Sequence, residues 1–117
     1  MIRPGEAVEV LLCREAVDFR KSINGLSIMV EQQLGIDPFR PQIFAFTNRR
    51  RDRVKLLYWE RSGFVLWMKR LEKARFPWPD EGDLVMSFTG RELNWLLDGI
   101  DVFRLRPHAT LSYESVL

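Results

Sequence analysis

The fold is decided by residues 43–70, which read IFAFTNRRRDRVKLLYWERSGFVLWMKR. Three runs in this stretch are rich in β-branched and aromatic residues and are typical of strands: Ile43–Thr47, Val54–Trp59 and Phe64–Lys69. The connections between these runs are short, and short connections join antiparallel neighbours. The stretch therefore predicts a three-stranded antiparallel meander at the centre of a sheet.

The residues before the meander predict one strand and one helix. Val8–Cys13 is a short apolar run that follows a Pro-Gly break, and we expect a strand there. Apolar residues then recur at steps of three and four, which is typical of an amphipathic helix: Ile23, Leu26, Val30 and Leu34. Asp18 is expected to cap the start of this helix, and Gly35 is expected to end it.

The residues after the meander predict a further strand and a second helix. Two prolines within residues 76–79 remove backbone donors, so this segment should leave the sheet, and residues 84–88 should form a short strand. Thr89 and Glu92 have the spacing of a capping box. The helix that follows carries an apolar stripe and a terminating glycine: Leu93, Leu96, Leu97, Ile100 and Gly99.

Together these elements predict an α+β fold with a single antiparallel sheet of four to five strands. The helix of residues 18–34 should pack on one face, and the helix of residues 89–98, near the C-terminus, should cover an edge or end of the sheet. A chain of 117 residues suits one domain, which we place at residues 1–103. Residues 104–117 should form a C-terminal tail that frays.

The composition is that of a soluble globular protein, with 46% hydrophobic and 29% charged residues. No apolar run approaches the roughly 18 residues that a membrane-spanning helix needs. The first residues have no signal-peptide pattern, and the lone Cys13 has no partner for an intramolecular disulfide. These features favour the cytoplasm and predict no contact with a membrane.

The sequence offers little for catalysis. His108 is the only histidine and Cys13 the only cysteine, so a paired-histidine metal site and a zinc knuckle are excluded. Four acids could form a two-metal nuclease site, although acids at a helix end are common for other reasons: Asp18, Glu60, Asp98 and Asp101. We expect a protein that is not an enzyme and has no metal, cofactor or small-molecule substrate.

The charge of the chain is unevenly distributed. The formal net charge is only +2, but residues 49–75 hold ten Lys or Arg against three acids, a net +7. The remainder holds eight basic and thirteen acidic residues, a net −5. This asymmetry predicts a basic face.

Two clusters supply that basic face. One precedes the second strand of the meander, and the other follows its third strand. Antiparallel strands bring the end of the third strand beside the start of the second, so the clusters should lie together. One guanidinium group can donate two parallel hydrogen bonds to the oxygens of a phosphate, and this favours contact with the DNA backbone. A solvated turn that protects a sheet edge is the alternative. The predicted phosphate contacts are Arg49, Arg50, Arg51, Arg53, Lys55, Lys69, Arg70, Lys73 and Arg75.

Aromatic residues are interleaved with these charges. They either stack on unpaired bases or belong to the core, and core positions are the commoner case. The residues concerned are Tyr58, Trp59, Phe64 and Trp67.

A second candidate anion site lies at the start of the first helix. Arg20 and Lys21 in a first helical turn would oppose the helix dipole, and Gly25 weakens a helix interior. Such conflicts often lie at functional sites, and a basic helix N-terminus suits a phosphate. The alternative is that Gly25 merely lets the helix approach the sheet closely.

Several short motifs occur along the chain in a defined order and spacing: Asp18–Lys21, Asn24–Leu26, Asp37–Phe39, Phe44–Phe46, Asn48–Leu57, Trp59, Glu60, Gly63, Trp67, Lys69–Glu72, Arg75, Phe76, Trp78, Pro79, Leu93, Leu96, Leu97 and Gly99–Asp101. In order and spacing, these motifs resemble the TnpB-type accessory protein of insertion-sequence-66-type transposable elements, the Orf2-like family. The resemblance covers nearly all of the chain to Asp101, with Ala74 in place of a usual Gly and Phe19 in place of a frequent Met.

The resemblance implies a non-catalytic accessory protein of transposition, encoded beside a separate, larger transposase that carries the catalytic carboxylates. DNA at the transposon ends and the transposase are the partners that we expect. Binding of DNA through the basic face is the first hypothesis. The second is a protein adapter that holds the transposase through an exposed apolar patch at Phe76 and Trp78.

Overall fold

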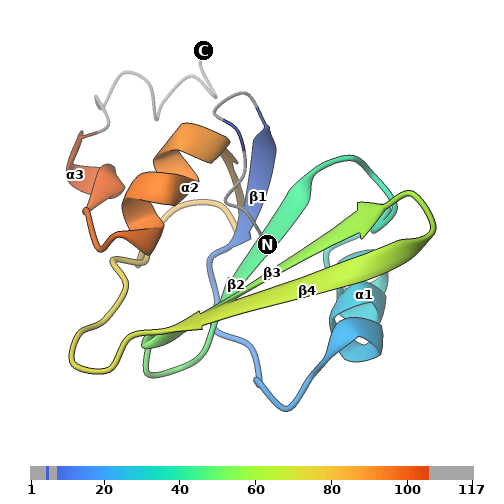
Figure 1. Ribbon diagram of the computed structural model, residues 1–117, viewed down its shortest axis with the longest axis horizontal. Helices are drawn as coiled ribbons and strands as arrows, with labels where there is room; N and C mark the ends of the chain where they lie inside the picture. Colours follow the sequence, from blue (N-terminus) through green and yellow to red (C-terminus); the bar gives the residue numbers. More distant parts are fainter. Residues whose placement is uncertain (1–4, 6–7, 106–117) are drawn as a thin grey trace.

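The computed structural model describes residue 5 and residues 8–105, which form one five-stranded sheet and three helices (Figure 1). The order along the sheet is β4-β3-β2-β1-β5. The elements are β1 (Glu9–Cys13), α1 (Ile23–Gln32), β2 (Ile43–Thr47), β3 (Arg53–Glu60), β4 (Gly63–Arg70), β5 (Val85–Thr89), α2 (Gly90–Leu97) and α3 (Val102–Leu105).

The sheet is mixed, so the prediction of a purely antiparallel sheet is wrong. β1 and β2 run parallel, with Leu11 beside Phe44, whereas the other three strand pairs are antiparallel. The cause is α1, which lies in the connection between β1 and β2 and returns the chain to the end of the sheet where β1 began. A strand-helix-strand order produces a parallel pair in this way.

The predicted antiparallel meander is confirmed, but it lies at one side of the sheet and not at its centre, because β4 is an edge strand. β3 pairs antiparallel with both β2 and β4, and the turn between β3 and β4 is so tight that Glu60 lies opposite Gly63. At the other end of this hairpin, Arg53 lies opposite Arg70. The two basic clusters therefore meet at the end where β3 begins and β4 ends.

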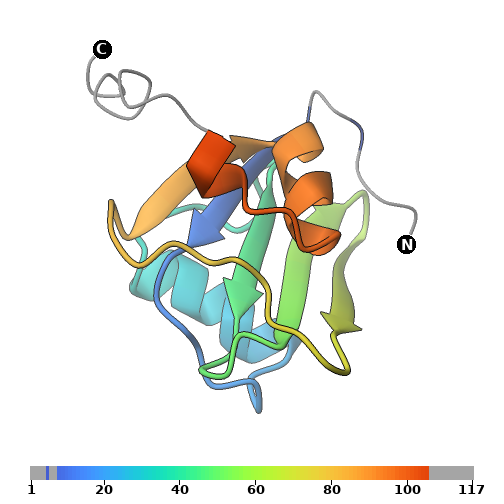
Figure 2. The ribbon, with the colours of Figure 1, turned by 90° about the vertical axis from the view of Figure 1, so that its left-hand side faces the viewer.

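The sheet is covered on both faces (Figure 2). α1 covers one face, where Leu26, Val30, Phe44, Phe46 and Leu57 form a buried cluster. The opposite face is covered by α2, α3 and residues 71–84. α2 therefore lies on a face of the sheet, not at an edge or end as predicted, and its stripe packs with the strands in a second buried cluster that includes Val10, Leu12, Ala45, Val54, Leu56, Leu93, Leu96 and Leu97.

The structure confirms some of the predicted helix ends and contradicts one of them. The capping box is confirmed, because the Glu92 amide donates to Thr89 Oγ1 at 3.1 Å and the Thr89 amide donates to Glu92 Oε1 at 3.0 Å. Gly35 follows α1 in the left-handed region, with φ of +68°, as a terminating glycine requires. The predicted cap at Asp18 is wrong, since α1 begins after Ser22.

The C-terminal region contains a third helix that the sequence did not predict. α3 includes residues 104 and 105, which we had assigned to the tail, and its first residue, Val102, is buried in the core. Residues 106–117 of the predicted tail, with His108, lie outside the described residues. None of the helices described in residues 8–105 is long and apolar enough to cross a membrane.

Candidate nucleic-acid interface

Three connecting segments meet where β1, β2 and β4 end and β3 begins, at the lower edge of the view in Figure 1. The amide of Val17 donates to the Thr47 carbonyl at 2.9 Å, which holds the β1–α1 connection against β2. The amides of Leu71 and Phe76 donate to the carbonyls of Asp52 and Arg51, at 2.8 and 2.7 Å. We call this region the basic end, because it gathers Arg20, Lys21, Arg49, Arg50, Arg51, Arg53, Arg70, Lys73 and Arg75.

The turn between β2 and β3 is held by its own side chains. Asn48 donates from Nδ2 to Asp52 Oδ1 at 2.6 Å and accepts at Oδ1 from the Arg53 amide at 3.1 Å. The Asn48 hydrogen bond lowers the pKa of Asp52, so this carboxyl stays charged within the turn. Between these fixed points, Arg49 and Arg50 are exposed. These hydrogen bonds therefore fix the backbone of the turn that carries the two exposed arginines.

Four cations are exposed at the basic end, and one of them, Arg50, interacts with the charge of the nearby Asp52. Within residues 8–105, no ion pair is formed by Arg49, Arg50, Lys73 or Arg75. The positive charge of these residues is therefore available to a partner.

Two further cations are paired with an acid two residues away. Arg20 Nη2 lies 2.6 Å from Asp18 Oδ2, and Arg70 Nη2 lies 3.0 Å from Glu72 Oε2. The hydrogen bonds from Arg20 lower the pKa of Asp18 to about 2. Both pairs are solvent-exposed, and such pairs contribute little to stability, so they can exchange for a phosphate.

Three of the predicted phosphate contacts are instead used inside the protein. Lys55 is 8% exposed, and its Nζ donates to the carbonyls of Phe19 and Lys21 at 2.9 and 2.7 Å. Lys69 Nζ donates to the Leu97 carbonyl at the end of α2, at 2.9 Å. The third is Arg51, which forms an ion pair with Asp80 at 2.7 Å. The structure therefore does not place Lys55 or Lys69 with the exposed cations.

Arg20 and Lys21 lie before α1, not within its first turn, so the predicted conflict with the helix dipole is absent. A Cβ added at Gly25 would approach Lys21 Cβ to 3.1 Å. Gly25 therefore makes room for the stem of Lys21 and not for the sheet. Lys21 is held beside Lys55, because the Lys55 ammonium donates to the Lys21 carbonyl.

Phe76 and Trp78 are not an exposed patch, so that prediction is wrong. They are 2% and 4% exposed, and Trp78 Nε1 donates to the Cys13 carbonyl at 3.1 Å. The prolines around them let the chain leave β4 and cross the sheet face, where both rings enter the core. These rings anchor residues 71–84 and are not accessible to a partner.

The aromatic residues of the meander divide between the two faces. Tyr58 and Trp67 pack against the core beneath α2. Trp59 and Phe64 contact each other on the α1 face, with ring centroids 5.1 Å apart, and both contact Phe39. Phe39 is 54% exposed, and the sequence analysis did not single it out. This aromatic cluster lies at the β3–β4 turn, at the opposite end of the hairpin from Arg53 and Arg70.

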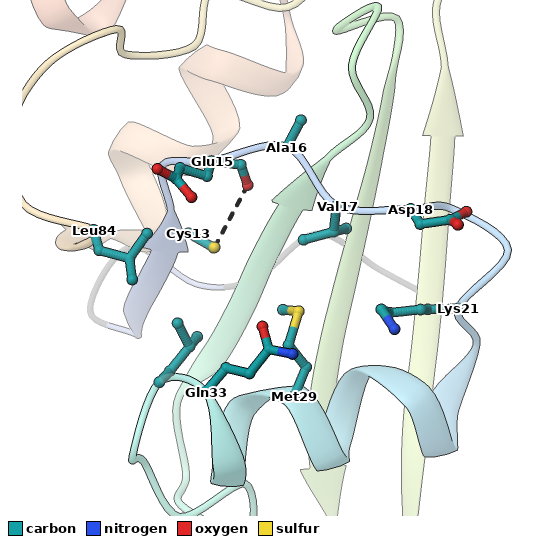
Figure 3. A pocket seen from close by; sticks show the side chains of 10 residues that line it. Cys13, Glu15, Ala16, Val17, Asp18, Lys21, Met29, Gln33 and Leu84 are labelled. Carbon is teal, nitrogen blue, oxygen red and sulfur yellow. Dashed lines mark hydrogen bonds between the residues drawn. The ribbon is translucent and has the colours of Figure 1, made fainter.

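A half-open pocket of about 330 Å³ lies between the end of β1, the connection that follows it and α1 (Figure 3). Cys13 Sγ donates to the Glu15 carbonyl in its wall, and burial raises the pKa of this thiol. Met29 and Leu84 supply apolar walls, and Asp18 and Lys21 line its rim. This mixed lining shows no arrangement of groups for a reaction.

The four acids considered for a nuclease site lie in three separate parts of the fold. Asp18 follows β1, Glu60 ends β3, and Asp98 and Asp101 follow α2. Among the described residues, no three His, Cys, Asp or Glu side chains are grouped as metal ligands.

Comparisons with known proteins identify relatives of this chain. The family model described as "IS66 Orf2 like protein" matches residues 8–107. "Uncharacterized protein y4jC" of Sinorhizobium fredii (strain NBRC 101917 / NGR234) is 34% identical over 106 residues, which are 91% of either chain. "Uncharacterized protein y4hO" of the same strain is 29% identical over 101 residues, 86% of this chain and 88% of its own. No solved structure matches significantly.

Proposed function

Because the chain belongs to the IS66 Orf2-like family, we propose that it is a non-catalytic accessory protein of DNA transposition that binds the DNA backbone through the basic end. One observation carries the proposal. Four exposed cations that form no ion pair within residues 8–105, Arg49, Arg50, Lys73 and Arg75, are held at the same end of the sheet by hydrogen bonds between their segments. An otherwise acidic chain gains nothing in solubility from concentrating its positive charge there.

The proposed contact is with phosphates and not with base edges. Guanidinium and ammonium groups on a turn position a protein along the backbone but carry no sequence information. Binding then releases counterions from the DNA, and the logarithm of the affinity falls linearly with the logarithm of the salt concentration. Sequence choice, on this proposal, comes from the transposase.

The test is a salt series of DNA binding, measured by fluorescence anisotropy with duplex from the transposon ends. Each phosphate contact contributes about 0.9 to the slope, so R49E/R50E should make the slope shallower by about 1.8. The matched control is R40E/R61E, which reverses two exposed cations at the opposite end of the sheet and should leave the slope unchanged. Equal slopes for both double variants, or no binding by the wild type, would contradict the proposal.

A protein adapter for the transposase is the second candidate, and the exposed ring of Phe39 favours it. The patch first expected for this role, Phe76 and Trp78, is in the core, so an adapter needs another apolar surface. Phe39 with Trp59 and Phe64 is such a surface. Co-purification with the transposase that survives nuclease treatment and is lost in Phe39→Ala, with the salt slope unchanged, supports the adapter.

A further inference from the structure

We propose that Arg53 and Arg70 together form a binding site for one phosphate group at the basic end. The inference deepens the proposed function and rests on it for DNA as the source of the phosphate. Binding of a free phosphate at this site does not depend on the proposed function. The register of β3 and β4 places these two arginines directly opposite each other.

The backbone hydrogen bonds show that this pair is of the close type. The Leu71 amide donates to the Asp52 carbonyl, which is the bond that flanks a non-hydrogen-bonded pair in an antiparallel ladder. The amide and carbonyl of Arg53 instead bond to Asn48, on the side of β2. In a non-hydrogen-bonded pair the Cα atoms lie about 4.5 Å apart and the side chains are closest. Two like charges at such a position repel each other.

The surroundings offset this repulsion only in part, because Asp52 interacts electrostatically with both Arg53 and Arg50. The Nε of Arg53 is buried without a hydrogen-bond partner, and within residues 8–105 no ion pair involves Arg53. Arg70 binds Glu72 through Nε and Nη2, which supplies one negative charge. Lys55 adds a third positive charge on the same face, two residues along β3, and its ammonium contacts only neutral carbonyls and the Phe19 ring.

The excess charge identifies the class of ligand. Burial, and then the charge of Arg53, lower the pKa of Lys55, whereas the charge of Asp18 acts in the opposite direction. Two adjacent guanidinium groups suit an oxyanion that accepts several hydrogen bonds at once. A phosphate group has this chemistry, either as one phosphate of the DNA backbone or as a free phosphate ester. A carboxylate is the weaker candidate, because Glu72 already neutralises one arginine.

The experiment titrates the protein with inorganic phosphate and follows Tm, with sodium chloride at matched ionic strength as reference. At ten times Kd, the wild type should gain roughly 4–8 °C over the chloride reference. R53Q and R70Q should each lose this gain. R40Q/R61Q, which removes two exposed arginines at the opposite end of the sheet, should keep it.

A second readout separates binding from a merely structural role. Without phosphate, R70Q should be at least as stable as the wild type, because it removes the repulsion opposite Arg53. The exposed Arg70 carries this test even if R53Q folds poorly. A phosphate gain that is the same in R70Q as in the wild type would overturn the site. So would a gain that chloride reproduces.

Competition identifies the source of the phosphate. If duplex DNA displaces inorganic phosphate from the wild type and binds R70Q with a slope about 0.9 shallower, the backbone is the source. Saturable phosphate binding in a protein that does not bind DNA supports the site with a free phosphate ester and contradicts the proposed function. DNA binding with the wild-type slope in both R53Q and R70Q overturns the site and leaves the proposed function intact.

Discussion

Replacement of Lys55 by Met should destabilise the protein without weakening its contact with DNA. Met keeps the length and the apolar stem of the side chain but removes the charge. In the wild type, the Lys55 ammonium joins the connection before α1 to β3 through hydrogen bonds to Phe19 and Lys21. It also lies 4.7 Å from the centroid of the Phe19 ring. The sequence alone placed this lysine among the phosphate contacts.

The magnitude follows from what the ammonium binds. A hydrogen bond from a charged group contributes about 1.5–3 kcal/mol, and two such bonds are lost. The Met side chain recovers part of this loss, because no charge has to be desolvated at a position that is only 8% exposed. We expect a net loss of about 2–3 kcal/mol in the free energy of unfolding. For a domain of this size, that loss lowers Tm by about 8–12 °C.

The assay is urea denaturation followed by circular dichroism, together with the DNA salt series on the folded variant. Lys73→Met is the matched control, since it makes the same substitution at an exposed lysine and should change stability by less than about 0.5 kcal/mol. A K55M protein as stable as the wild type would refute the reasoning. So would a salt slope shallower by about 0.9, which would place the Lys55 ammonium on a phosphate.

Three further changes test other parts of the structure. Thr89→Ala removes the acceptor of the capping box and should cost about 0.5–2 kcal/mol in thermal unfolding, whereas Thr89→Ser should cost little; equal costs would contradict the cap. Trp78→Phe leaves the Cys13 carbonyl without its donor and should cost about 1–3 kcal/mol in urea denaturation; no change would show that the bond is not needed. The pKa of Asp18 should be about 2 by NMR titration and should return toward 3.8 in Arg20→Gln. Because the folded-state pKa lies below the ordinary value, the stabilisation from Asp18 is present above about pH 4 and is lost as the pH falls toward 2; an unshifted carboxyl would contradict the ion pair.

The elements that sequence patterns predicted well are local ones. The capping box depends on Thr89 and Glu92, three residues apart, and the meander depends on short connections between apolar runs. The direction of β1 relative to β2 was mistaken, although the strand-helix-strand order was visible in the same sequence. That order favours a parallel pair, but the antiparallel meander that follows it was extended to the whole sheet.

The sequence could not show which cations bind groups within the protein and which are exposed, because the binding partners are distant in sequence. Lys55 binds carbonyls 34 and 36 residues away, and Arg51 binds Asp80, 29 residues away. Lys69 likewise binds a carbonyl in α2, 28 residues away. A count of positive charges gives the sign and the region of the basic end, but only the packing of the chain separates internal cations from exposed ones.

The position of β1 between β2 and β5 has a consequence for the order of folding during synthesis. Glu9 pairs with Thr89, so β1 receives its second neighbour only after 80 further residues have been added. Until then, β1 has an unpaired edge, and the sheet face beneath α2 is uncovered. Contacts between residues this far apart form slowly, and partly made chains with open edges aggregate. A nascent chain that is stalled before β5 should therefore bind chaperones, and one released after α2 should not.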